Sequence, residues 1–278
     1  MKQIKILDAP SFNDFIDNIE QHSKEFISNV VVAYRNANFS KEEQYQIMQK
    51  LGDTLNWYPK TGYDYVGKTY YQENHSRKYV KDPTRTDPEK ILLYFHMEHT
   101  DYINPMVGAT WNMYLFTGDS KNGRTAFVDT SELYKTMPED WQKFLSNCIE
   151  IIKKDVKISD TEYEMQSHRI KCVENHWFDN TPTIRIDLDT QENTEGIEFL
   201  DEKEVTKDDL VLFQKIKNFV FDQMLNNEDI RWYHEWQQGD LVIVDLFKMA
   251  HAVYGGFLPE EREFCGYWAY RSEITDKW

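Results

Sequence analysis

Histidines and carboxylates alternate in one short segment, Phe95 to Asp101, which has the residue types of a metal site. In an extended strand, residues i and i+2 point to the same face, so an imidazole and a carboxylate at this spacing can bind one ion. Two such pairs are present, His96 with Glu98 and His99 with Asp101. One distant histidine would complete a facial site of three ligands and leave the other positions of Fe(II) open. The spacing alone is a weak signal, because such pairs arise by chance in an acidic chain.

A distant histidine with a suitable neighbour lies near the C-terminal end of the sequence. The apolar run Leu241 to Asp245 predicts a strand that leads to His251, and Arg262 follows His251 by eleven residues. We expect a turn and a second strand between them, so that Arg262 lies near the metal across a hairpin. The planar guanidinium of arginine can bind a carboxylate through two hydrogen bonds. The two segments together predict a metal site beside a carboxylate-binding residue.

These motifs resemble the taurine dioxygenase-like family of Fe(II)- and 2-oxoglutarate-dependent enzymes, which includes relatives of clavaminate synthase. The family has an aromatic-His-x-Asp/Glu motif, a turn whose Thr contacts 2-oxoglutarate, and a distal Gly-Asp...Asp...His followed eleven residues later by Arg. The resemblance covers most of the chain, and the matching segments are Val30 to Arg35, Leu51 to Asp53, Phe95 to Glu98, Asn122 to Thr125, Arg231-Trp232, Trp236 to Asp240, and Asp245 with His251 and Arg262.

The resemblance implies a role for individual residues. His96, Glu98 and His251 would hold Fe(II), while Thr125 and Arg262 would bind the 2-oxoglutarate co-substrate. This register is preferred because an aromatic residue precedes His96 and because Pro105 and Gly108 follow at the family's spacing. The register with His99 and Asp101 as ligands remains the alternative, and in the preferred register these two residues lie in the turn beyond the metal.

The resemblance also implies an activity. The chain would be a dioxygenase that uses Fe(II), 2-oxoglutarate and O2 to hydroxylate an unactivated C–H bond of a small polar metabolite, such as an amino acid or related acid, with release of succinate and CO2. A carboxylate at position 98 favours hydroxylation over halogenation. Gly266 stands where taurine-oxidising relatives carry a second arginine, so taurine itself is not the expected substrate. The family's frequent Asp-Asn-Arg is replaced by Asp245-Leu246-Phe247.

Two other functions are compatible with the ligand set. A zinc hydrolase could use the same three ligands, but hydrolysis does not require a residue such as Arg262 to hold a 2-oxo acid. A non-catalytic metal-binding jelly-roll protein could keep the fold, but three retained ligands that leave other metal positions open for a co-substrate argue against it.

The hydrophobic pattern predicts the elements that position these residues. Helices are expected over 11–25, 40–52, 138–152 and 206–225, and strands over 26–34, 91–95, 108–116, 125–128, 169–174, 183–188, 241–245 and 263–270. A turn over 118–123 would join two of these strands in a hairpin. The loop over 56–90, which contains Tyr63, Tyr65, Tyr70, Tyr71 and Arg77, could form part of a substrate pocket. We expect one domain over 1–278, mainly β with flanking helices, with a double-stranded β-helix (jelly roll, cupin-like) core.

Composition limits the partners and the compartment. A formal net charge of -16 disfavours nucleic acid as a partner, because the average surface would repel phosphates. The three cysteines, Cys148, Cys172 and Cys265, are odd in number and far apart, which predicts reduced structural thiols and not a disulfide framework. The sequence has neither a signal-peptide pattern nor a run of eighteen apolar residues. We therefore expect a cytoplasmic enzyme with a small-molecule substrate and no contact with a membrane.

Overall fold

The computed structural model describes residues 4–59, 95–98, 106–157, 163–188, 194–257 and 261–271. The helices are α1 (Phe12–Asp17), α2 (Ile19–Asn29), α3 (Lys41–Leu55), α5 (Thr130–Thr136), α6 (Glu139–Ser146), α7 (Lys207–Asn226) and the 3-10 helix η2 (Glu228–Ile230). The strands are β1 (Lys5–Asp8), β2 (Val31–Arg35), β3 (Tyr58–Pro59), β4 (Met106–Phe116), β5 (Thr125–Asp129), β6 (Cys148–Lys157), β7 (Tyr163–Lys171), β8 (Val173–Asn175), β9 (Pro182–Ile184), β10 (Thr194–Phe199), β11 (Arg231–His234), β12 (Leu241–Asp245), β13 (Met249–Val253) and β14 (Arg262–Tyr270).

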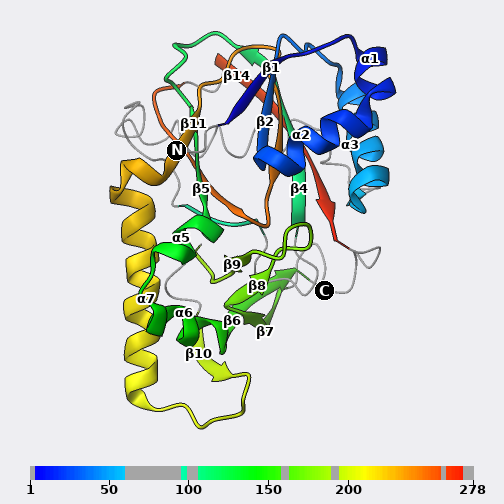
Figure 1. Cartoon of the computed structure of the whole chain (residues 1–278). Coiled ribbons are helices and arrows are strands. Elements are labelled where there is room, and N and C mark those ends of the chain that lie inside the picture. Colours follow the sequence, from blue (N-terminus) through cyan, green and yellow to red (C-terminus); the bar gives the residue numbers. More distant parts are fainter. Residues whose placement is uncertain are drawn as a thin grey trace.

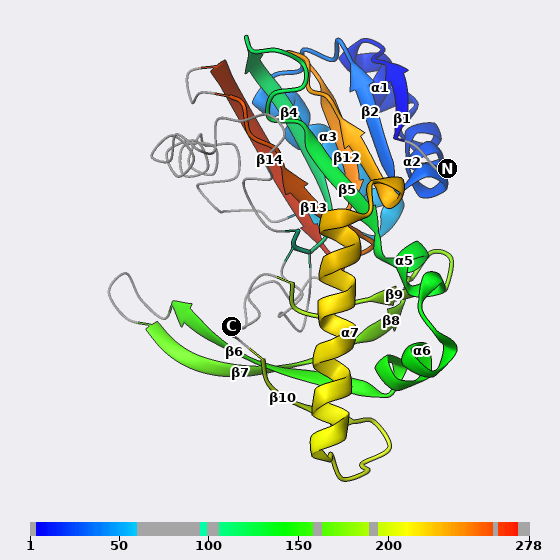
Figure 2. The ribbon, with the colours of Figure 1, turned by 90° about the vertical axis from the view of Figure 1, so that its left-hand side faces the viewer.

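Two facing sheets form the jelly-roll core. The large sheet has the strand order β1-β2-β12-β4-β14-β3, and the small sheet has the order β11-β5-β13. Figure 2 shows β14, β4, β12, β2 and β1 of the large sheet side by side. Large apolar side chains of both sheets meet in one buried cluster, which includes Trp111 and Val242 of the large sheet and Phe127 and Trp232 of the small sheet. The expected mainly β fold with a double-stranded β-helix core is confirmed.

Helices cover the outer faces of both sheets (Figure 1). Helices α1 to α3 pack on the large sheet, where Phe26, Met48 and Leu51 are fully buried. Helix α3 begins with a complete capping box formed by Ser40 and Glu43, as the sequence indicates. Helix α7 lies on the opposite side of the molecule and buries Ile216 and other apolar residues in a second cluster outside the small sheet. None of the described helices is both long and apolar enough to cross a membrane.

The helix expected over 138–152 is wrong in its second half. Helix α6 ends at Ser146, and β6 begins at Cys148. The burial of residues 148–152 alternates between buried and half-buried, which is the period of a strand. The charged residue in this run, Glu150, is buried because the ammonium group of Lys217 on α7 lies 2.8 Å from its carboxylate. A local sequence pattern cannot show this partner, because it is distant in the sequence. The β-branched isoleucines of the run also favour a strand.

Both expected hairpins are also wrong. Strand β4 pairs with β12 and β14, whereas β5 pairs with β11 and β13. The turn over 118–123 therefore leads from the large sheet to the small one. In the same way β13, which carries His251, lies in the small sheet, and β14, which carries Arg262, lies in the large sheet. Strands β4, β5, β13 and β14 each pair with strands from distant segments, so short spacing does not imply pairing.

Several expected boundaries move. Phe26 to Asn29 belong to α2 and not to a strand, and β2 begins only after Val30, which ends the helix in a left-handed conformation with φ 58°. The stretch expected as one strand over 169–174 is divided between β7 and β8, and of 183–188 only the first two residues lie in a strand, β9. The strand expected over 91–95 lies outside the described residues except for Phe95, and the Tyr-rich loop after Tyr58 lies outside them almost entirely.

Candidate active site

Two histidines from distant parts of the chain form a directly opposed strand pair. The backbone N–H of His96 donates to the carbonyl of His251 at 3.1 Å, and the N–H of His251 donates to the carbonyl of His96 at 2.9 Å. This bridge adds His96 beside β13 at the edge of the small sheet. Opposed residues of an antiparallel pair project to the same face, and the two imidazole rings lie 4.3 Å apart.

Glu98 brings a carboxylate to the same place. Its Oε1 atom lies 3.7 Å from Nε2 of His96 and 3.6 Å from Nε2 of His251. Within the described part of the chain, these three residues are the group of metal-ligating side chains whose ligand atoms all lie within 4.8 Å of one another. His99 and Asp101, the ligands of the alternative register, lie outside the described residues.

The protonation states of this group suit a divalent metal. Burial alone would raise the pKa of Glu98, but the two imidazoles outweigh burial and hold its pKa well below the usual range. Burial and, secondly, the neighbouring His96 lower the pKa of His251. A carboxylate and a neutral imidazole are the forms in which these side chains bind metals. The charge and geometry of the three residues therefore fit a site for Fe(II), for which two histidines and one carboxylate are a characteristic set.

The turn between β12 and β13 positions His251. Both backbone N–H groups of Phe247 and Lys248 donate to Oδ1 of Asp245 at 3.0 Å, and Oδ2 of Asp245 lies 2.8 Å from Nε2 of His176. Asp245 thus closes the turn with its own side chain. This explains how the chain reaches His251 although Leu246 and Phe247 depart from the Asp-Asn-Arg of the family: Phe247 packs in the core, and the guanidinium of Arg185 lies 4.1 Å from its ring centre.

Thr125 lies on the same face of the small sheet as His251. Strand β5 pairs with β13 so that Phe127 is opposite His251 and Thr125 is opposite Val253. The hydroxyl of Thr125 accepts a hydrogen bond of 2.9 Å from the indole N–H of Trp236, and both residues are buried. Because a hydroxyl can accept and donate at once, its proton remains available to a carboxylate.

Arg262 lies at the same end of the core as Thr125. Its guanidinium donates a long hydrogen bond of 3.4 Å to the carbonyl of Gly123, two residues before Thr125. The guanidinium also lies 4.9 Å from the ring centre of Phe257 and 5.1 Å from that of Phe264. Phe264 in turn contacts Trp236, the partner of Thr125, with ring centres 5.4 Å apart.

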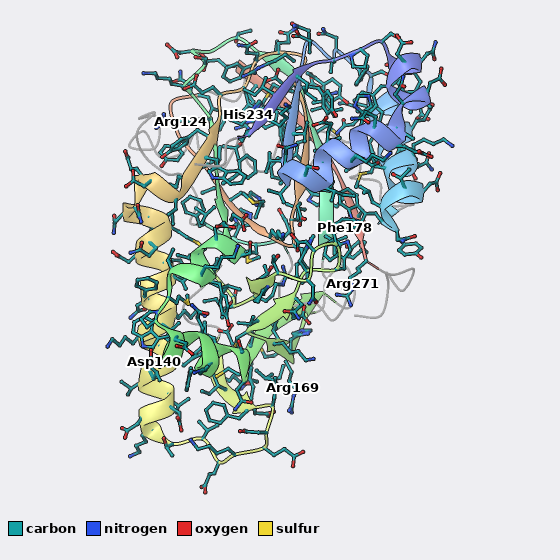
Figure 3. All side chains as sticks on the ribbon, in the orientation of Figure 1. Arg124, Asp140, Arg169, Phe178, His234 and Arg271 are labelled. Atoms are coloured by element: carbon teal, nitrogen blue, oxygen red, sulfur yellow. The ribbon has the colours of Figure 1, made fainter. Side chains whose placement is uncertain are left out.

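The Gly-Asp motif before β12 has a structural task. The carboxylate of Asp240 is fully buried; its Oδ2 lies 3.0 Å from Nε2 of His234, accepts the backbone N–H of Gln237 at 2.8 Å, and forms an ion pair with Arg35. These contacts join β2, β11 and β12. Figure 3 labels His234 among the strands of the upper part of the molecule. The motif therefore holds together the strands that support the site, and Asp240 does not reach the metal cluster.

Two indoles beside the site were not assigned a role from the sequence. Trp236 was noted only as part of a family match, although its N–H orients the hydroxyl of Thr125. Trp111 packs its ring 5.0 Å from that of His251 and 5.8 Å from that of Phe127. Neither role has a local signal in the sequence, because each depends on which strands of the two sheets face each other.

Solved structures of dioxygenases share this fold. A taurine dioxygenase from Burkholderia xenovorans superposes with a TM-score of 0.68 at 12% identity, over 96% of this chain and 89% of that one. AAD-2, solved in complex with Mn(II) and N-oxalylglycine, superposes with a TM-score of 0.66 at 10% identity, over 100% of this chain and 98% of that one. No curated protein shows significant similarity to the sequence. These superpositions show that the chain has the same jelly-roll fold as these dioxygenases.

The sequence model of the taurine catabolism dioxygenase TauD, TfdA family matches residues 6–268. The chain belongs to this family. It is therefore a 2-oxoglutarate-dependent dioxygenase whose co-substrates are 2-oxoglutarate and O2 and whose metal is Fe(II). The resemblance noted in the sequence and the expected enzyme class are confirmed.

Proposed function

We propose that this dioxygenase hydroxylates an unactivated C–H bond of a small polar metabolite, such as an amino acid or related acid, and releases succinate and CO2. The observation that carries the proposal is the convergence of His96, Glu98 and His251 within 4.8 Å. In the proposal these residues are the ligands of Fe(II). We further propose that residues 1–278 form one domain, because strands from both ends of the described chain lie in the large sheet. The proposed setting is the cytoplasm, which suits three buried free cysteines.

Different residues of the chain would bind the metal and the 2-oxoglutarate. His96 and His251 would offer their lone pairs to the metal, and Glu98 would offset part of its charge. The bound Fe(II), 2-oxoglutarate and O2 supply the oxidising chemistry. Arg262 would pair with the distal carboxylate of 2-oxoglutarate, and the hydroxyl of Thr125, whose oxygen already accepts from Trp236, would donate to the same group. The proposed role of the protein is thus positioning and exclusion of water, with no side chain acting as a general base.

Hydroxylation is proposed because position 98 carries a carboxylate. A small residue there would leave a metal position for a halide, as in halogenases of the family. Taurine is not proposed as the substrate. A side chain at Gly266 would have to occupy space already filled, since its Cβ would lie 2.9 Å from Trp268 and 3.1 Å from Trp111. A second arginine for a sulfonate has no room at this position.

The test is anaerobic addition of Fe(II) and 2-oxoglutarate to the purified protein. The expected result is a weak visible charge-transfer band that needs both components. Glu98→Ala should lose the band, while the exposed substitution Glu139→Ala should keep it. A folded, iron-loaded wild-type sample without the band would overturn the proposal. The protein loaded with Zn(II) in place of iron would then be assayed for hydrolase activity, the alternative that uses these ligands.

The substrate can be sought by succinate release. A panel of amino acids and small acids would be added to the iron-loaded protein in air, and coupled succinate formation measured for each. The expected result is a small polar compound that raises the rate well above uncoupled turnover. If only taurine raised it, the argument from Gly266 would be wrong.

A further inference from the structure

The indole of Trp111 lies between the two ends of the proposed co-substrate site. Toward the metal cluster its ring is 5.0 Å from that of His251. Toward Arg262, which is proposed to bind the distal carboxylate, the ring of Trp111 is 6.0 Å from that of Phe264. The guanidinium of Arg262 lies over the Phe264 ring. Phe127 stacks on it from the opposite sheet. A molecule that extends from the metal to Arg262 therefore passes alongside Trp111.

Within the described part of the chain, the indole nitrogen of Trp111 is a buried donor without an acceptor. Trp111 is 4% exposed, and its Nε1 atom has no hydrogen-bond partner among the described residues. A buried N–H that lacks an acceptor costs free energy, and most such groups in folded proteins have a partner. An acceptor that arrives with a ligand would remove this cost.

Gly266 has no side chain, which lets the ring edge that carries this nitrogen lie close to β14. A Cβ at position 266 would lie 3.1 Å from Cδ1 of Trp111, which is the ring carbon bonded to Nε1, and 2.9 Å from Cη2 of Trp268. Gly266 is opposite Trp111 in the pairing of β4 with β14. The absence of a side chain therefore lets the N–H edge of Trp111 approach the backbone of β14 inside the core.

A second buried indole shows that an unpartnered N–H is not sufficient evidence by itself. Nε1 of Trp57 also lacks a hydrogen-bond partner among the described residues. Trp57, however, lies on the outer face of the large sheet, beneath the helices, where its ring contacts Phe26 and closes over Gly108. The distinguishing feature of Trp111 is its contact with the proposed metal ligand His251 on one side and with Phe264, against which Arg262 packs, on the other.

We propose that Trp111 is a co-substrate-binding residue whose indole N–H donates a hydrogen bond to the carboxylate at the metal-binding end of 2-oxoglutarate. This inference rests on the proposed function of the site. The metal-binding end is chosen because the indole touches His251 directly and reaches Arg262 only through Phe264. A charged acceptor makes the hydrogen bond stronger than one between neutral groups.

The test compares Trp111→Phe with the matched control Trp57→Phe. Both changes remove one buried, unpartnered indole N–H and keep an aromatic ring. Binding of 2-oxoglutarate to the Mn(II)-loaded proteins is measured by calorimetry without O2. We expect Trp111→Phe to raise the Kd by roughly 10-fold or more, which corresponds to about 1.4 kcal/mol. Trp57→Phe should change it by less than about 2-fold, and the Mn(II) affinity should be unchanged in both.

A shorter 2-oxo acid identifies the carboxylate. 2-Oxobutanoate has the metal-binding end of 2-oxoglutarate and lacks the distal carboxylate. Trp111→Phe should weaken its binding by a similar factor. Equal Kd values for Trp111→Phe and Trp57→Phe, or a loss seen with 2-oxoglutarate alone, would overturn the inference. Wild-type protein that binds no 2-oxoglutarate would instead overturn the proposed function.

A measurement on the wild-type side chain covers the case in which Trp111→Phe does not fold. The Zn(II)-loaded protein is labelled with 15N-tryptophan, so that its eight indole N–H groups give separate resonances. Addition of 2-oxoglutarate should move one indole proton strongly downfield, the signature of a new hydrogen bond to a carboxylate. If no indole proton moves downfield when 2-oxoglutarate binds, the inference is wrong.

Discussion

The hydroxyl of Thr125 illustrates how single side chains are prepared for a ligand at this site. Its oxygen accepts the N–H of Trp236, which fixes the hydroxyl in a buried position on the inner face of the small sheet. Thr125→Val keeps the shape of the side chain and removes the hydroxyl. We expect the KM for 2-oxoglutarate to rise by about 10-fold, the loss of roughly one hydrogen bond to a charged group, while the KM for the organic substrate changes little. Steady-state kinetics at a saturating concentration of the organic substrate would show this. An unchanged KM for 2-oxoglutarate would show that Thr125 does not bind the co-substrate.

Glu98 separates the two ligand registers at the residue scale. Glu98→Ala removes the carboxylate that lies within 3.7 Å of both imidazoles. We expect it to abolish iron-dependent turnover of 2-oxoglutarate, whereas Asp101→Ala should retain part of it. Succinate formation at fixed Fe(II) measures both. The opposite outcome would show that His99 and Asp101 are the metal ligands.

Helix α7 is joined to β6, the central strand of a third sheet with the order β10-β6-β7, by a buried ion pair. The side chains of Lys217 and Glu150 are both 0% exposed; Nζ of Lys217 lies 2.8 Å from Oε1 of Glu150, and the hydroxyl of Thr194 donates to the same oxygen at 2.6 Å. Lys217→Met leaves a buried carboxylate without its cation. We expect the free energy of unfolding to fall by about 3–5 kcal/mol.

The control for this pair is the exposed ion pair of Lys143 and Glu139, whose side chains are 74% and 81% exposed. Lys143→Met should change the free energy of unfolding by less than about 0.5 kcal/mol. Urea denaturation measures both variants. In the double variant Lys217→Met/Glu150→Gln, part of the loss should be recovered, because no charge remains buried. A single variant as stable as the wild type would show that the pair does not hold α7 in place.

Elements with local signals could be predicted from the sequence, and elements held by distant partners could not. The capping box at Ser40 and the apolar face of α7 identify these two helices, and the alternate His96 and Glu98 identify the candidate metal cluster. The local pattern predicts a helix over the first half of β6, because the partner of its buried Glu150 is 67 residues away. The pairing of β4, β5, β13 and β14 was also missed, since register across a jelly roll is fixed by sheet packing and not by turn length.

Stability of the whole molecule should depend on two histidines that burial favours in the neutral form, the buried His234 and the half-buried His22. Burial lowers the pKa of His234, although Asp240 acts in the opposite direction, and Arg35 and Glu235 also face it. Burial likewise lowers the pKa of His22, against a smaller opposing effect of Glu25. A lowered pKa means that the unfolded chain binds the proton first. The contribution to stability is therefore complete above the ordinary value of 6.5 and is lost as the pH falls below it.

We accordingly expect the free energy of unfolding of the metal-free protein to decrease between pH 7.5 and pH 5.5. Urea denaturation at several pH values measures this decrease. The net charge of -16 becomes less negative over the same range, which works in the opposite direction, so the series should be repeated in about 0.5 M salt to screen that repulsion. A constant or rising stability in high salt would contradict the proposed neutral state of these histidines.

In the proposed active site, residues from distant parts of the chain surround one metal ion. A crystal structure of the Mn(II)-loaded protein, with anomalous scattering data to locate the metal, tests it most directly. We expect one strong anomalous peak between Nε2 of His96, Nε2 of His251 and the carboxylate of Glu98, at about 2.0–2.3 Å from each ligand atom. A peak bound by His99 and Asp101, or one distant from His251, would contradict it.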